Sequence, residues 1–159
     1  MKRLIASLTL VGWLIANPAG AQSLASCGIA VTPIPFGTYD PTSPADVTPT
    51  GTVTAGCSLI LGVSLFVAYS ITMSPGSGSY TARKMTGTAT PLYYNLYLNG
   101  AMTQVWGDGV SNGTGAQSEF YLLGVGGNIK NYTIFAKLPA RQLVSAGGYA
   151  DSITVTIAY

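Results

Sequence analysis

The chain contains no histidine and very little charge. Charged residues make up 8% of the 159 positions, against about 25% in an ordinary soluble protein. Without histidine, neither a Ser-His-Asp triad nor a Cys-His pair can be assembled. The carboxylates are few and scattered, and nothing places two of them, such as Asp40 and Asp108, at the separation that glycoside hydrolysis needs. We therefore expect no catalytic residues and no enzymatic activity.

Cysteine is also scarce, with only Cys27 and Cys57 in the whole chain. In an exported protein such a pair is most simply one disulfide, whose loop of about 30 residues would stabilise the fold by roughly 3 to 4 kcal/mol. A metal or redox site is the alternative, but the absence of histidine and of a CxxC pair leaves it without support. We expect no metal and no cofactor.

The first 21 residues have the pattern of an export signal. Lys2 and Arg3 precede an apolar run that extends from Leu4 to Ala16, and small residues at 19 and 21 form a cleavage pattern. A membrane anchor is the alternative, but the run is shorter than the ~20 residues that a span needs. We predict a signal peptide over residues 1–21 and one domain over 22–159, exported to the periplasm and then to the cell surface or medium. The only membrane partnership expected is through that signal.

Removal of the signal leaves a chain that is close to neutral. Five basic residues then face five acidic ones, so no basic surface suggests nucleic acid as a partner. They are Arg83, Lys84, Lys130, Lys137 and Arg141 against Asp40, Asp46, Asp108, Glu119 and Asp151.

What the chain has instead is strand patterning, most clearly at its last residues. Ser152 to Tyr159 alternates apolar with small polar residues, which is the period-2 pattern of a half-buried strand. Its apolar face consists of Ile153, Val155, Ile157 and Tyr159. No residue of the sequence follows to supply the next strand, so we expect the sheet to end there at an unpaired edge.

The rest of the chain predicts several more strands separated by turns. Gly28 to Tyr39 reads as an edge strand because of its prolines, and Gly51 to Cys57 places Val53, Ala55 and Cys57 on an inward face. Leu59 to Met73 reads as one or two buried strands, although a membrane segment is the alternative. Further strands are expected at Leu92–Leu98, Gln117–Leu123 and Asn131–Lys137.

Two turns carry specific expectations. Asn99-Gly100 predicts a tight type I′ hairpin into Ala101–Trp106. Gly107 to Gly115 is expected to be a flexible loop. With no convincing helix, the strands and turns predict an antiparallel β-sandwich.

Several stretches together resemble one family, the spore coat protein U domain, which also supplies subunits of archaic chaperone-usher pili. The matching stretches run through nearly the whole chain after the signal. They are Cys27, Phe36-Gly37-Thr38-Tyr39-Asp40-Pro41, Gly51-Thr52-Val53-Thr54-Ala55-Gly56-Cys57, Arg83-Lys84-Met85, Leu92-Tyr93-Tyr94-Asn95-Leu96-Tyr97, Trp106-Gly107-Asp108-Gly109 and Gly148-Tyr149-Ala150-Asp151-Ser152-Ile153-Thr154-Val155.

The resemblance implies an immunoglobulin-like β-sandwich that lacks its last strand. It implies that a periplasmic chaperone lends the missing strand, that an outer-membrane usher takes part in assembly, and that another pilin-like subunit then replaces the chaperone's strand. Ile153, Val155, Ile157 and Tyr159 would line the acceptor groove. Only Gln22 to Ser26 separate the expected cleavage site from Cys27, too few residues for a donor strand, so we expect a tip or minor subunit, or a secreted member outside any fibre.

An adhesin or glycan-binding module is the second functional hypothesis. Trp106 and Asp108 would form its ligand loop, with Tyr93 and Tyr97 adding aromatic surface against which a sugar can stack. Two other residues favour structural roles. We expect Arg83 to anchor a strand or loop, and Tyr149 to make a tyrosine corner, in which the phenol bonds to nearby backbone.

Overall fold

A computed structural model describes residues 24–60, 65–87 and 89–159, and the segment predicted to be an export signal lies outside them. Eight strands and one short 3-10 helix, η1 (Ser111–Gly113), make up its regular structure. The strands are β1 (Ala25–Val31), β2 (Thr50–Leu59), β3 (Leu65–Met73), β4 (Arg83–Met85), β5 (Leu92–Tyr97), β6 (Gln117–Leu123), β7 (Asn128–Lys137) and β8 (Val155–Ala158).

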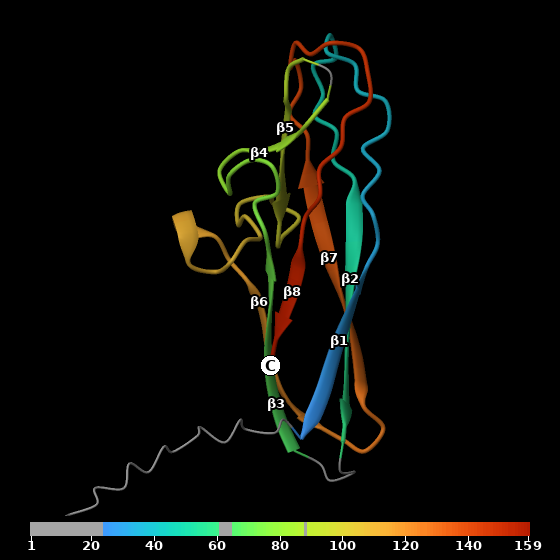
Figure 1. Ribbon diagram of the computed structural model, residues 1–159, viewed down its shortest axis with the longest axis vertical. Coiled ribbons are helices and arrows are strands. Elements are labelled where there is room, and N and C mark those ends of the chain that lie inside the picture. Colours follow the sequence, from blue (N-terminus) through green and yellow to red (C-terminus); the bar gives the residue numbers. More distant parts are fainter. Residues whose placement is uncertain (1–23, 61–64, 88) are drawn as a thin grey trace, which may run out of the picture.

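The strands form two antiparallel sheets that pack as a sandwich (Figure 1). One sheet has the order β1-β2-β7-β5-β4 and the other the order β6-β3-β8. Within the described residues no helix has the length and apolarity to cross a bilayer. The apolar stretch ending at Met73 therefore contributes strand β3, as the strand interpretation predicted, although residues 61–64 lie outside the description.

The core follows from the alternation of side chains along each strand. On β2, Val53, Ala55 and Cys57 are buried while the residues between them are half-buried. On β5, Leu92, Tyr94 and Leu96 are buried, and both patterns confirm the inward faces predicted from the sequence. Because the side-chain period of a strand is two, each sheet turns one apolar face toward the other.

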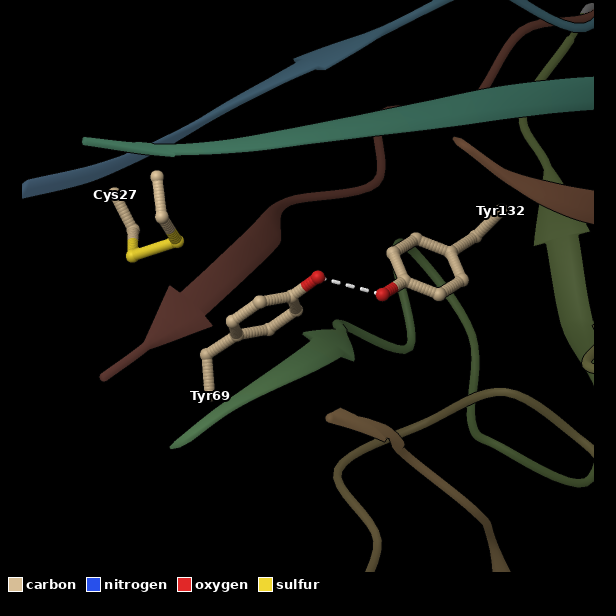
Figure 2. Close-up of a disulfide and its surroundings, with 4 residues drawn as sticks. Cys27, Tyr69 and Tyr132 are labelled. Atoms are coloured by element: carbon tan, nitrogen blue, oxygen red, sulfur yellow. Dashed lines mark hydrogen bonds between the residues drawn. A yellow bond between two sulfur atoms is a disulfide. The ribbon is translucent and has the colours of Figure 1, made fainter. Parts of the chain in front are cut away.

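A disulfide and a pair of tyrosines link elements at one end of the sandwich (Figure 2). Cys27 on β1 is bonded to Cys57, the residue directly opposite it on β2. Between the sheets, the hydroxyls of Tyr69 on β3 and Tyr132 on β7 lie 2.6 Å apart in a hydrogen bond. Burial and this bond raise the pKa of Tyr132, so its phenol remains protonated at neutral pH.

The hairpin at Asn99-Gly100 occurs, but its turn differs from the predicted type I′ turn. Met102 N–H bonds to Asn99 C=O, and it is Met102, rather than Asn99 or Gly100, that has a positive φ, of 55°. The Asn99 side chain bonds to both the backbone N–H and the hydroxyl of Thr103. This side chain stabilises a longer loop, which closes where Leu98 N–H bonds to Gln104 C=O.

The two sheet edges formed by the first and last strands lie near each other. β1 pairs only with β2, and β8 pairs only with β3, among the strands of the described residues. Figure 1 shows β8, in red, beside β3 and facing the sheet that contains β1. Each strand therefore leaves one backbone edge toward the space between the sheets.

Candidate functional site

The space between these two edges is a groove of about 920 Å³ with apolar walls. One wall is the segment that continues β1, residues 31–39, and the other is the segment that leads into β8, residues 144–155. Both segments rise from their strands toward the same end of the molecule in Figure 1. The groove is thus bounded by the two ends of the described fold.

The first wall forms because the chain loses its ability to pair with β2. Thr32 still bonds to Thr52, N–H to C=O at 3.0 Å, but Pro33 and Pro35 have no N–H to continue the ladder. The segment instead lies close over β2 at Gly51, where a Cβ would come within 2.6 Å of Ile34 Cγ1. Gly51 therefore permits a close approach that a larger residue would obstruct.

The second wall is held by tyrosine and carboxylate contacts. Tyr149 donates its hydroxyl hydrogen to the C=O of Ser145 at 2.7 Å, which confirms the tyrosine corner. Asp151 accepts hydrogen bonds from Ser77 N–H, from the Ser77 hydroxyl and from the Tyr94 hydroxyl. The wall is consequently tied to the turn after β3 and to β5 in the opposite sheet.

The floor of the groove consists of core side chains from both sheets. They are Met73 on β3, Met85 on β4, Leu92, Tyr94 and Leu96 on β5, and Ile134 and Leu138 on and just after β7. Phe36 reaches from the first wall to this floor, with its ring 5.5 Å from that of Tyr94 in an edge-to-face contact. An occupant would meet apolar surface along most of the groove's depth.

Electrostatics also favour an uncharged occupant. Asp151 is the one charged residue among those that line the groove, and its carboxylate already accepts the bonds from Ser77 and Tyr94. Burial, followed by the bond to Asp151, raises the pKa of Tyr94, so that phenol stays neutral. In the described ranges no three His, Cys, Asp or Glu side chains gather into a possible metal site.

Of the four residues expected to line a groove beside the last strand, only two do so. Ile153 and Val155 line the cavity, whereas Ile157 is half-buried against the core outside it and Tyr159 is 53% exposed. The reason is that the groove lies beyond the beginning of β8, where Ser152 to Thr154 run without strand pairing. The wall at residues 31–39 and the floor residues were not identified as groove residues from the sequence. The proline pair at 33 and 35 was the available signal for the wall.

Trp106 and Asp108 are placed differently from the predicted ligand loop. Trp106 is fully buried, and its indole N–H donates to Ile71 C=O at 2.9 Å. This corrects the prediction that the indole offers a surface for a sugar. Its backbone N–H bonds to Leu96 C=O in one sheet, while its indole bonds to Ile71 in the other, which holds the ring between the sheets.

The loop from Gly107 to Gly115 is organised by Asp108. Its carboxylate accepts bonds from the N–H groups of Val110 and Ser111 and from the hydroxyls of Ser111 and Thr114. These bonds, the Ser111 hydroxyl first, hold the pKa of Asp108 well below its usual range. The carboxylate is used to fold its own loop, which is therefore more ordered than the sequence predicted.

Arg83 is fully buried and anchors the loops around it, as predicted. Its guanidinium donates to Ser74 C=O, to Trp106 C=O at 2.7 Å and to Asn95 Oδ1 at 2.7 Å. Burial lowers the pKa of Arg83 while nearby phenols and Asp151 oppose that effect. The side chain joins the turn after β3, strand β5 and the strand-like segment at 105–106.

The fold and groove define a class: an antiparallel immunoglobulin-like β-sandwich with an open apolar groove between its first and last strands. The model of the Spore Coat Protein U domain family matches residues 15–156. The chain belongs to that family.

One solved structure is similar in fold at low sequence identity. It is the crystal structure of the CsuC-CsuE chaperone-tip adhesion subunit pre-assembly complex from archaic chaperone-usher Csu pili of Acinetobacter baumannii, with 20% identity and a TM-score of 0.55. The match covers 86% of the present chain but only 40% of the solved one. No curated protein gives a significant match.

Proposed function

We propose that the chain is a non-enzymatic subunit of an exported surface fibre or coat that accepts a β-strand from another polypeptide. The observation that carries the proposal is the apolar groove between the segment that continues β1 and the segment that leads into β8, next to the unpaired edges of both strands. An extended segment placed there could form main-chain bonds with an edge while alternate side chains enter the groove. The family membership and the fold similarity to a chaperone–subunit complex support this reading.

Partners follow from the same proposal. A periplasmic chaperone would occupy the groove first, and a neighbouring subunit would replace it at an outer-membrane usher. Ala25 and the residues after it already belong to β1 of this domain, so a donor segment would have to precede Ala25. With cleavage after Ala21 that leaves very little chain, and a tip or minor subunit is the position we propose.

The free energy that an inserted strand would contribute explains why a partner would be needed. If four or five inserted side chains each contribute about 1.5 to 3 kcal/mol of burial, the strand contributes about 6 to 15 kcal/mol before ordering costs. That is comparable to the whole stability of an ordinary domain. A subunit with an empty groove should therefore be poorly soluble or unstable on its own.

The test compares two substitutions on adjacent positions of β8. Val155 lines the groove, while Thr156 is exposed on the opposite face. We expect V155D to place a charge in the groove and to reduce co-purification with a co-expressed periplasmic chaperone of archaic chaperone-usher pili by tenfold or more. T156D should leave co-purification with the chaperone within twofold of the wild-type level.

Backbone exchange locates the contact independently. In the chaperone complex, amide hydrogen exchange should slow in residues 31–39 and in β8, on the sides that face the groove. A chain of residues 22–159 that is soluble, monomeric and stable at full yield without any chaperone would contradict the proposal. So would equal retention of V155D and T156D.

The glycan-binding hypothesis has less support, because neither residue of its expected ligand loop is available to a sugar. Its central aromatic residue, Trp106, is buried, and Asp108 is engaged within its own loop.

A further inference from the structure

Strand β6 forms the edge of the smaller sheet that lies away from the groove. Strand β6 pairs with β3 over all seven of its residues, from Gln117 to Leu123. No other strand of the described residues pairs with its second edge. In the sheet order β6-β3-β8, this edge is separated from the groove by two strands.

β6 has few of the devices that usually protect a sheet edge. Native edges are kept from pairing by proline, by charged side chains, including inward-pointing ones, by bulges or by very short strands. β1 is followed by Pro33 and Pro35, and β4 has only three residues, two of them Arg83 and Lys84. β6, with the sequence QSEFYLL, is long and contains neither proline nor lysine.

The one charge on β6 points between the sheets and is neutralised there by an ion pair, so it opposes edge pairing less than an unpaired inward charge would. Glu119 lies opposite Tyr69, a buried residue of β3, and so shares its inward face. Its carboxylate is 2.7 Å from Lys130 Nζ in an ion pair. The edge therefore carries no outward charge to oppose a second strand.

The outer face next to this edge is apolar and uncharged. Phe66 and Phe120 stack in parallel, with ring centroids 5.3 Å apart, yet remain 64% and 69% exposed. Leu122, opposite Phe66, is 58% exposed. The outward residues of the sheet include no charged side chain; they are Phe66, Ala68, Ser70, Thr72, Ser118, Phe120, Leu122, Thr156 and Ala158.

We propose that β6 pairs antiparallel with β6 of a second copy of this chain about a two-fold axis at Phe120. Phe120 is the middle residue of the strand, so this register pairs all seven residues and sets the two Phe120 side chains opposite each other, on an outer face that continues from one copy into the other. Ser118 then lies opposite Leu122 of the other copy. Moving the axis to Glu119 would set two carboxylates opposite each other, which is unfavourable, and would shorten the pairing.

A second copy is the favoured occupant because the edge is self-complementary. An antiparallel pair of identical strands satisfies both backbone edges by one symmetric contact. The outward side chains that adjoin across the pairing carry no charge and do not repel, and the chain after signal removal has almost no net charge to keep copies apart.

The contact should be weak. An aromatic side chain covers about 150–250 Å² when buried, so the two-thirds-exposed Phe120 side chains of two copies supply roughly 200–350 Å² beyond the backbone pairing. That is less than the ~1,200–2,000 Å² of a stable interface. We therefore expect a concentration-dependent dimer rather than a permanent one.

Disulfide trapping tests the register directly. Residues directly opposite across strands have Cβ atoms about 4.5–5.5 Å apart, close enough for a disulfide with small adjustment. Mixing S118C with L122C under mild oxidation should give a cross-linked dimer, because position 118 of one copy lies opposite position 122 of the other. S118C alone and L122C alone should give little, because four residues then separate the cysteines along the strand. No cross-link in the mixture at high micromolar protein, or an equal yield from S118C alone, would overturn the proposal.

Sedimentation of the otherwise unmodified chain supplies the second measurement. F120K should weaken association about tenfold or more, whereas V125S, which alters an equally exposed apolar residue in the turn after β6, should not. Residues 22–159 are used with the groove occupied by the chaperone if the free chain is insoluble.

This proposal stands apart from the proposed function, and the variants separate the two. Loss of self-association in V155D but not in F120K would assign association to the groove and overturn the β6 contact. Loss of self-association in F120K, with normal chaperone binding, would support the β6 contact whatever the groove binds.

Discussion

At the scale of single residues, Arg83 holds together three parts of the chain that are distant in sequence. Its three acceptors belong to Ser74, Asn95 and Trp106, and Asn95 in turn donates to Tyr80 C=O. A buried cation surrounded by acceptors is favourable only while every bond is made. The residue therefore stabilises the fold through satisfied polar groups rather than through an ion pair.

We expect R83M to lower the free energy of unfolding by roughly 3 kcal/mol or more, because it leaves three acceptors without their donor at about 1–3 kcal/mol each. Chemical denaturation measures the effect. The matched control is K84M, since the neighbouring Lys84 side chain is half-buried and points to the other face of β4. A loss under 1 kcal/mol for R83M would contradict the structural role.

Asp108 makes the loop at 107–115 sensitive to acid. The folded protein lowers the pKa of this carboxyl, so its contribution to stability is complete above the unfolded value of about 3.9 and is lost as pH falls below it. We expect the protection factors of the Val110, Ser111 and Thr114 amides, which compare exchange with its intrinsic rate at the same pH, to fall at low pH in the wild type.

In D108N the same amides should have lower protection factors already at pH 7 and should lose much less further protection on acidification. The measurement is hydrogen exchange followed from pH 7 to pH 3. An unchanged loop in D108N would show that the carboxylate bonds do not order it.

At the scale of elements, the disulfide joins the edge strand β1 to the interior strand β2. The two cysteines are 30 positions apart, and the segment between them includes the wall of the groove at residues 31–39. Without the bond, β1 would be held by pairing with one strand only. The bond thus fixes the starting point of that wall.

We expect the double variant C27S/C57S to lose about 3 to 4 kcal/mol in unfolding free energy, because the unfolded chain gains the entropy of the open loop. Urea denaturation of oxidised wild type and of the variant measures the difference. Reduced wild type is the control and should match the variant. A loss in the variant that exceeds the loss on reduction would instead indicate a packing defect.

The elements show how far local patterns determine structure. The alternation at Gly51–Cys57 and at Leu92–Leu98 predicted the correct strands and faces, because burial of one face follows directly from side-chain period. The turn at Asn99 could not be predicted, because the Asn99 side chain bonds to Thr103 and replaces the expected tight turn. The last strand was expected from Ser152 but begins at Val155. Before it, the Asp151 carboxylate accepts a bond from the Ser77 hydroxyl, and Thr154 N–H bonds to the Ser74 hydroxyl instead of to a backbone C=O.

At the scale of the whole molecule, the sequence predicted the sandwich and the open position beside its last strand. It did not predict which residues border the groove, because those come from six segments brought together only by the sheet order. Ile153 and Val155 carry a local pattern, whereas Met85 and Ile134 reach the same groove from β4 and β7. Trp106 was misplaced for the same reason, since its burial depends on contacts with Ile71.

The groove also predicts a gain in stability when it is filled. We expect fusion of a linker and an alternating Val/Thr strand after Tyr159 to raise the unfolding free energy by at least about 3 kcal/mol, equivalent to burying two apolar side chains. The same fusion with Asp at the inward positions is the control. A gain of equal size from both fusions would mean that the strand does not enter the groove.

The position of the groove links its formation to the order in which the chain is made. Its two walls extend from β1 and β8, whose sequence positions are more than a hundred residues apart, and such distant contacts form late in folding. A shortened chain that ends before β8 would offer only one of the two edges. A partner that needs both edges therefore selects polypeptides synthesised and folded through their last strand, and leaves incomplete ones uncaptured.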